Sequence, residues 1–326
     1  MKLQEISRRS LLKATAGTAA TALLPSLGSA QDTGALEWVV GYPAGGGSDT
    51  TVRLLADHMA KTLGRPIVVN NKPGAGTTIA AQYVMTARTP MLFSADFATL
   101  AANPFLFSKL PYDPDKDFAP IGLLARAPML LVVSPKVPAS NFQEFLAWAK
   151  HQPDGISFAS AGVGSPHHLV GEQVKELLGV RMTHIAYRGA SPALNDLMGG
   201  QVPMAMMDLG SAYPFISTNK INVFAVATLQ RVKTLPTVPT FDELGYKGYE
   251  AYAWQGVVAS NATPEDLRVK LNAALNAALS LTEVKARLQV FGVEGLPGPI
   301  DKLMPYARTE RIRWGEVIKK NGIRID

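Results

Sequence analysis

Two glycine-rich segments carry the residues best suited to chemistry. The first loop, residues 43–49, holds Gly45, Gly46, Gly47, Ser48 and Asp49, and the second loop, residues 161–165, holds Ala161, Gly162, Gly164 and Ser165. Each is predicted to join a strand to a helix. A helix N-terminus presents unpaired N–H groups and a partial positive charge, and glycine lets a ligand approach the backbone closely. Each loop is therefore a candidate anion-binding cradle, although such turns also occur without a ligand.

Known nucleotide motifs are missing from both loops, which narrows the choice of anion. A phosphate-binding P-loop requires a lysine before Ser or Thr, but residues 44–50 contain no lysine. A dinucleotide fingerprint requires a third glycine, where these loops have Thr50 and His167. Carboxylates are satisfied by backbone N–H and hydroxyl donors alone. The sequence therefore favours one small carboxylate gripped by both loops, or the two ends of a diacid.

Several charged or titratable residues lie near these loops or at other predicted strand ends. Asp49, Asp96 and Asp208 occupy positions where a carboxylate usually caps a helix. Arg188 follows a predicted strand and is either solvated or a carboxylate partner. His168 begins a helix beside the second loop, where it either faces solvent or reaches a ligand.

Motifs of enzymes and metal sites are absent from the sequence. Neither Ser48 nor Ser165 lies in a Gly-x-Ser-x-Gly elbow. His167 and His168 are adjacent, whereas a zinc-binding His-Glu-x-x-His motif separates its histidines by four positions. We therefore expect no catalytic residues, no metal and no cofactor.

The elements that position the loops follow an alternating pattern. From Leu36 onward, short apolar runs alternate with helical periodicity, which is typical of βα units and a largely parallel sheet. The apolar run 121–134 is predicted to cross between two halves near Leu130, and the strand 223–228 to lead the chain back. We predict two α/β lobes: residues 31–130 with 229–326, and residues 131–228.

Composition excludes several protein classes. The chain has 326 residues, no cysteine, 47% hydrophobic and 18% charged residues. These values exclude disordered, disulfide-stapled, Cys-ligated metal and collagen-like chains. The formal charge of +6 falls to +3 without the first thirty residues, and no basic cluster with interleaved aromatics follows. We expect no nucleic-acid partner.

The N-terminus has the pattern of an export signal. Paired arginines in the segment 7–13 precede a mildly apolar stretch, 14–27, and small residues at 28–30. This stretch is too short and too weakly apolar to span a membrane. Residues 1–30 are therefore predicted to be a twin-arginine-type signal peptide, with a mature periplasmic protein beginning near Gln31. No later run of 18 apolar residues predicts a membrane span.

Six segments together resemble the Bug (TctC-like) family, the periplasmic substrate-binding proteins of tripartite tricarboxylate transporters. They are VVGYPAGGGSD (39–49), VVNNKPGAG (68–76), LPYDPDKDFAP (110–120), FASAGVGSPHHLVG (158–171), YRGASPALNDLMGGQV (187–202) and WQG (254–256). The resemblance covers the whole mature chain. It implies a type II periplasmic-binding-protein fold, in which two α/β lobes enclose a ligand cleft.

The resemblance also implies where the ligand lies. In that family the ligand carboxylate is held between the two loops, largely by backbone groups and ordered water. Carried over, this adds Tyr42, Pro43 and Ser160 to the loop residues, with Arg188 and Asp208 as secondary candidates. The family usually has a longer turn where this chain has only residues 88–90. The shorter turn bears on the geometry of residues 94–96, including Ser94 and Asp96, and on the pocket wall they are expected to form. Thr77 and Thr78, where small residues are common in the family, also bear on the pocket.

The resulting prediction is a monomeric receptor that binds a small carboxylate and delivers it to membrane subunits of the transporter. Mono-, di- and tricarboxylates, amino acids and aromatic acids all remain open as the ligand. Two other functions remain open: a periplasmic sensor subunit for a signalling receptor, and a secreted α/β enzyme.

Overall fold

The computed structural model describes residues 34–290 and 292–325, so the predicted signal peptide lies outside the described residues. From Ala35 onward the chain forms one compact unit. Within the described part, no helix combines the length and apolarity needed to cross a bilayer. Helices and strands alternate along this unit, which confirms the predicted α/β class.

The first group of strands includes the strand that leads into the first loop. β1 (Leu36–Val40) pairs in parallel with β2 (Ile67–Asn71) and with β3 (Met91–Asp96), and β3 pairs antiparallel with β9 (Tyr252–Ser260). The short β10 (Glu294–Gly295) pairs with a further strand, β4. The helices of this group are α2 (Gly47–Leu63), α3 (Thr78–Met85), α4 (Asn103–Leu106), α9 (Glu265–Ser280) and α10 (Thr282–Val290), with short helical turns at Ala75–Thr77, Ala98–Ala102 and Ile300–Lys302.

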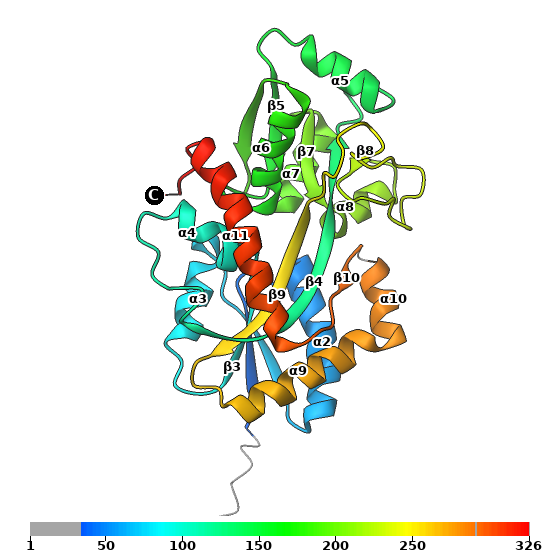
Figure 1. Cartoon of the computed structure of the whole chain (residues 1–326). Helices are drawn as coiled ribbons and strands as arrows, with labels where there is room; N and C mark the ends of the chain where they lie inside the picture. The colour runs from blue at the N-terminus through cyan, green and yellow to red at the C-terminus, as the bar shows by residue number, and fades with distance from the viewer. Residues whose placement is uncertain (1–33, 291, 326) are drawn as a thin grey trace, which may run out of the picture. The chain divides into compact units, whose positions relative to one another are not determined.

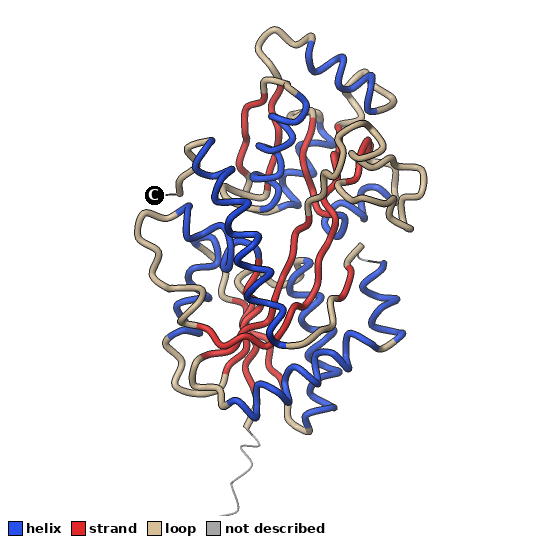
Figure 2. Tube along the Cα trace, in the orientation of Figure 1, coloured by secondary structure: helices blue, strands red, loops and turns tan. Residues whose placement is uncertain are grey.

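One long strand, β4 (Phe118–Val133), joins this group to a second one. β4 pairs antiparallel with β9 as far as Pro128 and with β7 (Met204–Asp208) from Met129 onward. In Figure 2, β4 and β9 are the two long strands that run side by side between the two groups. Because β4 is buried along most of its length, it reads in sequence as the continuous apolar run that predicted a crossing.

The second group of strands includes the strand that leads into the second loop. β5 (Ile156–Ser160) pairs in parallel with β6 (Met182–Ala186) and with β7, and β8 (Asn222–Val226) pairs with β4. The strand predicted at 223–228 therefore stays in this group, and β9 makes the return to the first group. The helices of the second group are α5 (Phe142–Lys150), α6 (Pro166–Leu178), α7 (Ala190–Gly199) and α8 (Leu209–Ile216).

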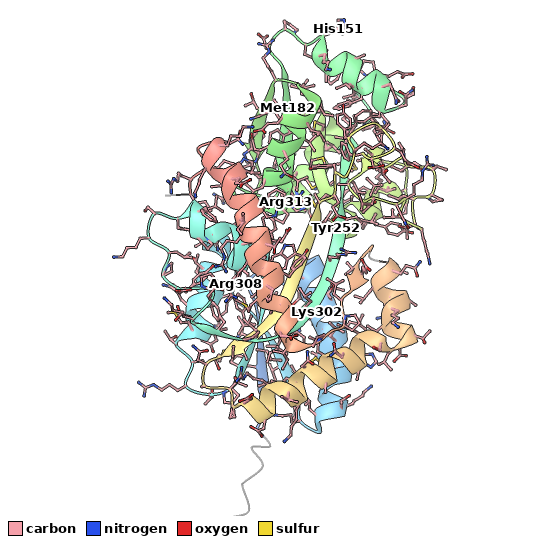
Figure 3. The ribbon with its side chains drawn as sticks, in the orientation of Figure 1. His151, Met182, Tyr252, Lys302, Arg308 and Arg313 are labelled. Atoms are coloured by element: carbon pink, nitrogen blue, oxygen red, sulfur yellow. The ribbon has the colours of Figure 1, made fainter. Side chains whose placement is uncertain are left out.

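The last helix, α11 (Leu303–Lys320), packs against both groups (Figure 1). Trp254 of β9 and Trp314 of α11 are buried and donate their indole N–H groups to the same oxygen of Glu310, over 3.0 and 2.9 Å. Arg313, labelled on α11 in Figure 3, donates to the backbone oxygen of Glu250 over 2.6 Å. Since Lys320 also reaches Glu176 of α6 over 2.6 Å, α11 ties the returning strand and the second group together.

Candidate functional site

The first loop is held in shape by Asp49, which is buried at the start of α2. Its carboxylate accepts hydrogen bonds from the backbone N–H of Gly45 (2.8 Å), from Asn71 Nδ2 (2.9 Å) and from Arg53 Nε (3.0 Å). Burial opposes ionisation of this carboxyl, but the donors outweigh burial and hold its pKa below the usual value. All of these partners belong to the protein, so Asp49 supports the loop. Pro43 and residues 45–47 are exposed.

Ser48 links this loop to a distant strand. Ser48 precedes a predicted helix and is a plausible N-cap in sequence, but helix α2 begins at Gly47, and its N-cap position, Gly46, has no side-chain cap, so Ser48 does not cap it. Instead, Ser48 Oγ donates to Gln255 Oε1 on β9 over 3.0 Å, across 207 positions of sequence. Gln255 also pairs with Asp96 across the sheet. Sequence reasoning quoted Gln255 only as part of a motif and missed it as a site residue.

Tyr42 and Asp96 form a hydrogen-bonded polar pair beside the first loop. The Tyr42 hydroxyl donates to Asp96 Oδ2. The other oxygen, Asp96 Oδ1, accepts from the backbone N–H and hydroxyl of Thr99 over 3.0 and 2.9 Å, and Thr99 Oγ1 lies 2.7 Å from Thr77 Oγ1. Burial, then the adjacent Asp96 carboxylate, raises the pKa of Tyr42 well above its usual value. Tyr42 therefore remains a donor to Asp96, and both carboxylate oxygens are occupied.

The shortened turn at 88–90 leaves β3 regular. β3 pairs with β1 and β9 along its length, up to the pair of Asp96 with Gln255. Ser94, on the same strand, is buried and accepts the Trp38 indole N–H over 3.0 Å. The turn precedes β3, whereas Asp96 ends it, so the strand separates the two.

The second loop bonds largely to itself. Gly162 N–H donates to Ser160 Oγ over 3.1 Å, and Ser165 Oγ donates to the Gly162 backbone oxygen over 2.7 Å. Ser165 is also the N-cap of α6, because its oxygen accepts the His168 N–H over 3.3 Å. These bonds fix the loop that precedes the α6 N-terminus.

His168 supports this loop from within the protein. Its Nδ1 accepts the Gly164 N–H over 3.1 Å, and its ring stacks on His184, with centroids 3.6 Å apart. His184 Nε2 in turn lies 2.6 Å from Ser160 Oγ. Burial, then the neighbouring positive charges, lowers the pKa of His168 to about 3, and burial lowers that of His184 to about 4. Both rings are therefore neutral at physiological pH.

Arg188 lies beside the second loop. The backbone around it is joined to the loop, because Tyr187 N–H donates to the Ser160 oxygen and Gly189 N–H to the Ala161 oxygen, over 3.0 and 3.1 Å. The Arg188 side chain is exposed, and among the described residues it forms no hydrogen bond or ion pair. It therefore offers a free guanidinium at the edge of this loop.

Asp208 ends β7 and pairs with the first turn of α6. Its Oδ2 lies 2.9 Å from His167 Nε2, and its Oδ1 accepts the Ser211 N–H at the start of α8 over 2.9 Å. Burial opposes ionisation of Asp208, but the bonds from His167 and Ser211 prevail and lower its pKa. The structure thus gives His167, which was not among the predicted site residues, a direct bond to one of them.

The two loop regions are neighbours in space. A side-chain carbon added to Gly164 would lie 2.2 Å from Leu106 of α4, so the second loop packs directly on the first group. The negative charge of Asp208 also helps to raise the pKa of Tyr42, which adjoins the first loop. The structure therefore brings together the two loops, Arg188, and the carboxylates of Asp96 and Asp208.

This arrangement offers donors more readily than acceptors. The first N–H groups of α2 have no partner within the helix and no side-chain cap, whereas at α6 Pro166 has no N–H and Ser165 caps the His168 N–H. No group of metal-ligating side chains occurs among residues 34–290 and 292–325. The arrangement can bind an anion through backbone N–H groups and the exposed guanidinium of Arg188.

Two regions of the chain match models of known protein families or signals. Residues 51–323 match the model described as tripartite tricarboxylate transporter family receptor. Residues 5–25 match the twin-arginine translocation pathway signal sequence.

Three solved structures resemble the chain over most of its length. The periplasmic binding protein BugD is 35% identical, with a TM-score of 0.81, over 89% of this chain and 98% of that chain. A Rhodopseudomonas palustris protein solved with adipate is 29% identical, with a TM-score of 0.84, over 90% and 98%. MatC from the same organism, solved with bound malate, is 35% identical, with a TM-score of 0.78, over 87% and 98%.

Proposed function

Because this chain belongs to the tripartite tricarboxylate transporter receptor family, we propose that it binds a small carboxylate and delivers it to the membrane subunits of such a transporter. The family is one of periplasmic solute-binding proteins. The twin-arginine signal directs this chain to the periplasm, where such receptors act.

The ligands bound in two structural neighbours support the proposed ligand class, small carboxylates. Adipate and malate are both dicarboxylates, and the proteins that hold them match this chain over nearly their whole length. In our proposal the two loops of this chain bind one carboxylate each or share one. The residues proposed to line the site are Tyr42, Pro43, Gly45, Gly46, Gly47, Ser48, Asp49, Thr77, Ser94, Asp96, Ser160, Ala161, Gly162, Gly164, Ser165, His168, Arg188 and Asp208.

Binding and release are proposed to occur by movement of two lobes, one around each group of strands. The β4 and β9 strands join the groups and serve as the hinge in this proposal. A ligand that contacts both loops favours the closed arrangement, and the membrane subunits would recognise that arrangement. The receptor is proposed to act as a monomer and to perform no chemistry on its ligand.

The test is thermal unfolding of the mature protein, from Gln31 onward, with a panel of carboxylates after unfolding and refolding to remove bound ligand. Gly47→Val is the site variant, because an added side-chain carbon at Gly47 meets no atom within 4 Å. Gly199→Val, which also has room, is the control outside the site. Gly164 is unsuitable, since its φ of +74° and its contact with Leu106 would make any larger residue destabilising.

A true ligand at 100 times its dissociation constant adds about 2.7 kcal/mol of stability, which raises the midpoint by a few degrees. We expect such a shift for a few related acids, reduced in Gly47→Val and retained in Gly199→Val. A folded protein that shows no shift with any carboxylate would overturn the proposal.

A further inference from the structure

One buried polar atom beside the proposed site has no partner. His167 is 7% exposed, and its Nδ1 is buried without a hydrogen bond to any residue in the described part of the chain. His167 is the second residue of α6, directly after the second loop. A buried acceptor or donor left unpaired costs stability, and such an atom at a ligand site points to a group that the ligand supplies.

Asp208 fixes how this ring presents itself. In the neutral ring, the Nε2–H donates to Asp208 Oδ2 over 2.9 Å, and Nδ1 is then an acceptor. Figure 1 shows α6 beside β5 and β7, and Asp208 stands at the end of β7. The imidazole therefore spans from the first turn of α6 to the end of the strand, at the place where the two loop regions meet.

Each of the neighbouring acceptors already has a hydrogen-bond donor within the protein. Both oxygens of Asp96 accept from Tyr42 and Thr99, and both oxygens of Asp208 accept from His167 and Ser211. Gln255 Oε1 accepts from Ser48. Among these groups, His167 Nδ1 alone has no hydrogen bond to any described residue.

Asn103 Oδ1 is a second buried acceptor without a partner. Its amide donates to the Gly76 oxygen over 2.7 Å and to the Tyr112 hydroxyl over 3.0 Å, so Asn103 belongs to the turn at Ala75–Thr77. Its side chain bonds to no residue of either loop. His167 is the better candidate because its bonding partner, Asp208, is itself a predicted site residue.

We propose that His167 Nδ1 accepts a hydrogen bond from a hydroxyl group of the ligand, so that the receptor prefers hydroxycarboxylates to the corresponding unsubstituted acids. This inference rests on the proposed function. It makes His167 a specificity-determining residue held in place by Asp208.

The experiment measures the dissociation constants of three matched pairs by calorimetry: malate and succinate, 2-hydroxyglutarate and glutarate, and lactate and propionate. Wild type is expected to bind the hydroxy acid of at least one pair about 10- to 100-fold more tightly, the range expected when a buried polar atom is otherwise left unpaired. The affinity for the unsubstituted acid sets the baseline within each pair.

Two variants separate the ring nitrogens. His167→Gln places an amide near the Nε2 position, retains a donor to Asp208 and removes the Nδ1 acceptor, so it is expected to abolish the hydroxyl preference. His167→Asn places its oxygen near Nδ1 and is expected to retain part of that preference. His168→Phe is the control at the next position, where both acids of a pair should weaken alike.

Equal affinities within every pair in wild type would overturn the inference while leaving the proposed function intact. An equal loss for both acids in His167→Gln would also overturn it, because His167 would then act on the carboxylate they share. If no acid of any pair binds, and the wider carboxylate panel also fails, the proposed function itself fails.

Discussion

The stacked imidazole rings of His168 and His184, which support the second loop, predict that the folded protein loses stability in acid. His184→Phe is the informative change, because a phenyl ring preserves the stacking on His168 and the tilted ring contact with Phe158 and removes one titrating group. Ser160 Oγ keeps its bonds to Gly162 in this variant, so the hydroxyl is not left unpaired.

The magnitude follows from the two lowered pKa values. Burial lowers the pKa of His168 from 6.5 to about 3 and that of His184 from 6.5 to about 4. Between these lowered pKa values and 6.5, the two histidines are protonated in the unfolded chain but not in the folded chain. As far as these two histidines determine it, the free energy of unfolding is therefore constant above pH 6.5. It falls as the pH drops below that value, by up to about 1.4 kcal/mol per pH unit for each histidine. Together they contribute a slope of roughly 2 to 3 kcal/mol per unit between about pH 6 and pH 4.

The assay is urea unfolding at half-unit steps from pH 4 to pH 7 for wild type, His184→Phe and a control. The slope of the unfolding free energy against pH is expected to be about 1.4 kcal/mol per unit smaller in His184→Phe than in wild type. His151→Asn is the control, since His151 is exposed at the end of α5 (Figure 3) and should leave the slope unchanged. Parallel curves for wild type and His184→Phe would refute the reasoning, because the buried rings would then not be the source of acid sensitivity.

Two further changes test the framework of the site. Tyr42→Phe removes the donor to the buried Asp96 Oδ2 and is expected to cost about 1 to 3 kcal/mol in urea unfolding. Tyr83→Phe, at an exposed hydroxyl, should cost less than about 0.5 kcal/mol, and an equal cost at both positions would contradict the argument. Glu310→Ala leaves the buried indoles of Trp254 and Trp314 unpaired and should cost about 2 to 4 kcal/mol, whereas Glu310→Gln retains an acceptor. Equal losses in the two Glu310 variants would show that the indole bonds contribute little.

The α/β architecture and both loops could be predicted because their signals are local. Apolar runs of strand length, helical periodicity and glycine before a helix are each written within about twenty residues of sequence. The strand β4 was visible for the same reason, since a buried strand leaves an unbroken apolar run. The export signal is likewise a contiguous pattern, and it matches a twin-arginine sequence.

The bonds within the site were decided by tertiary structure. Successive helix residues point about 100° apart, so His167 faces Asp208 while His168 faces His184, and the sequence His-His does not distinguish them. Ser48 looks like a helix cap in sequence, but Gln255 lies within reach only after β9 returns beside β3. The sequence by itself therefore determined the fold class, the export signal and the two loops. The partners of each polar group depend on contacts across many residues, and only packing of the strands and helices decides those.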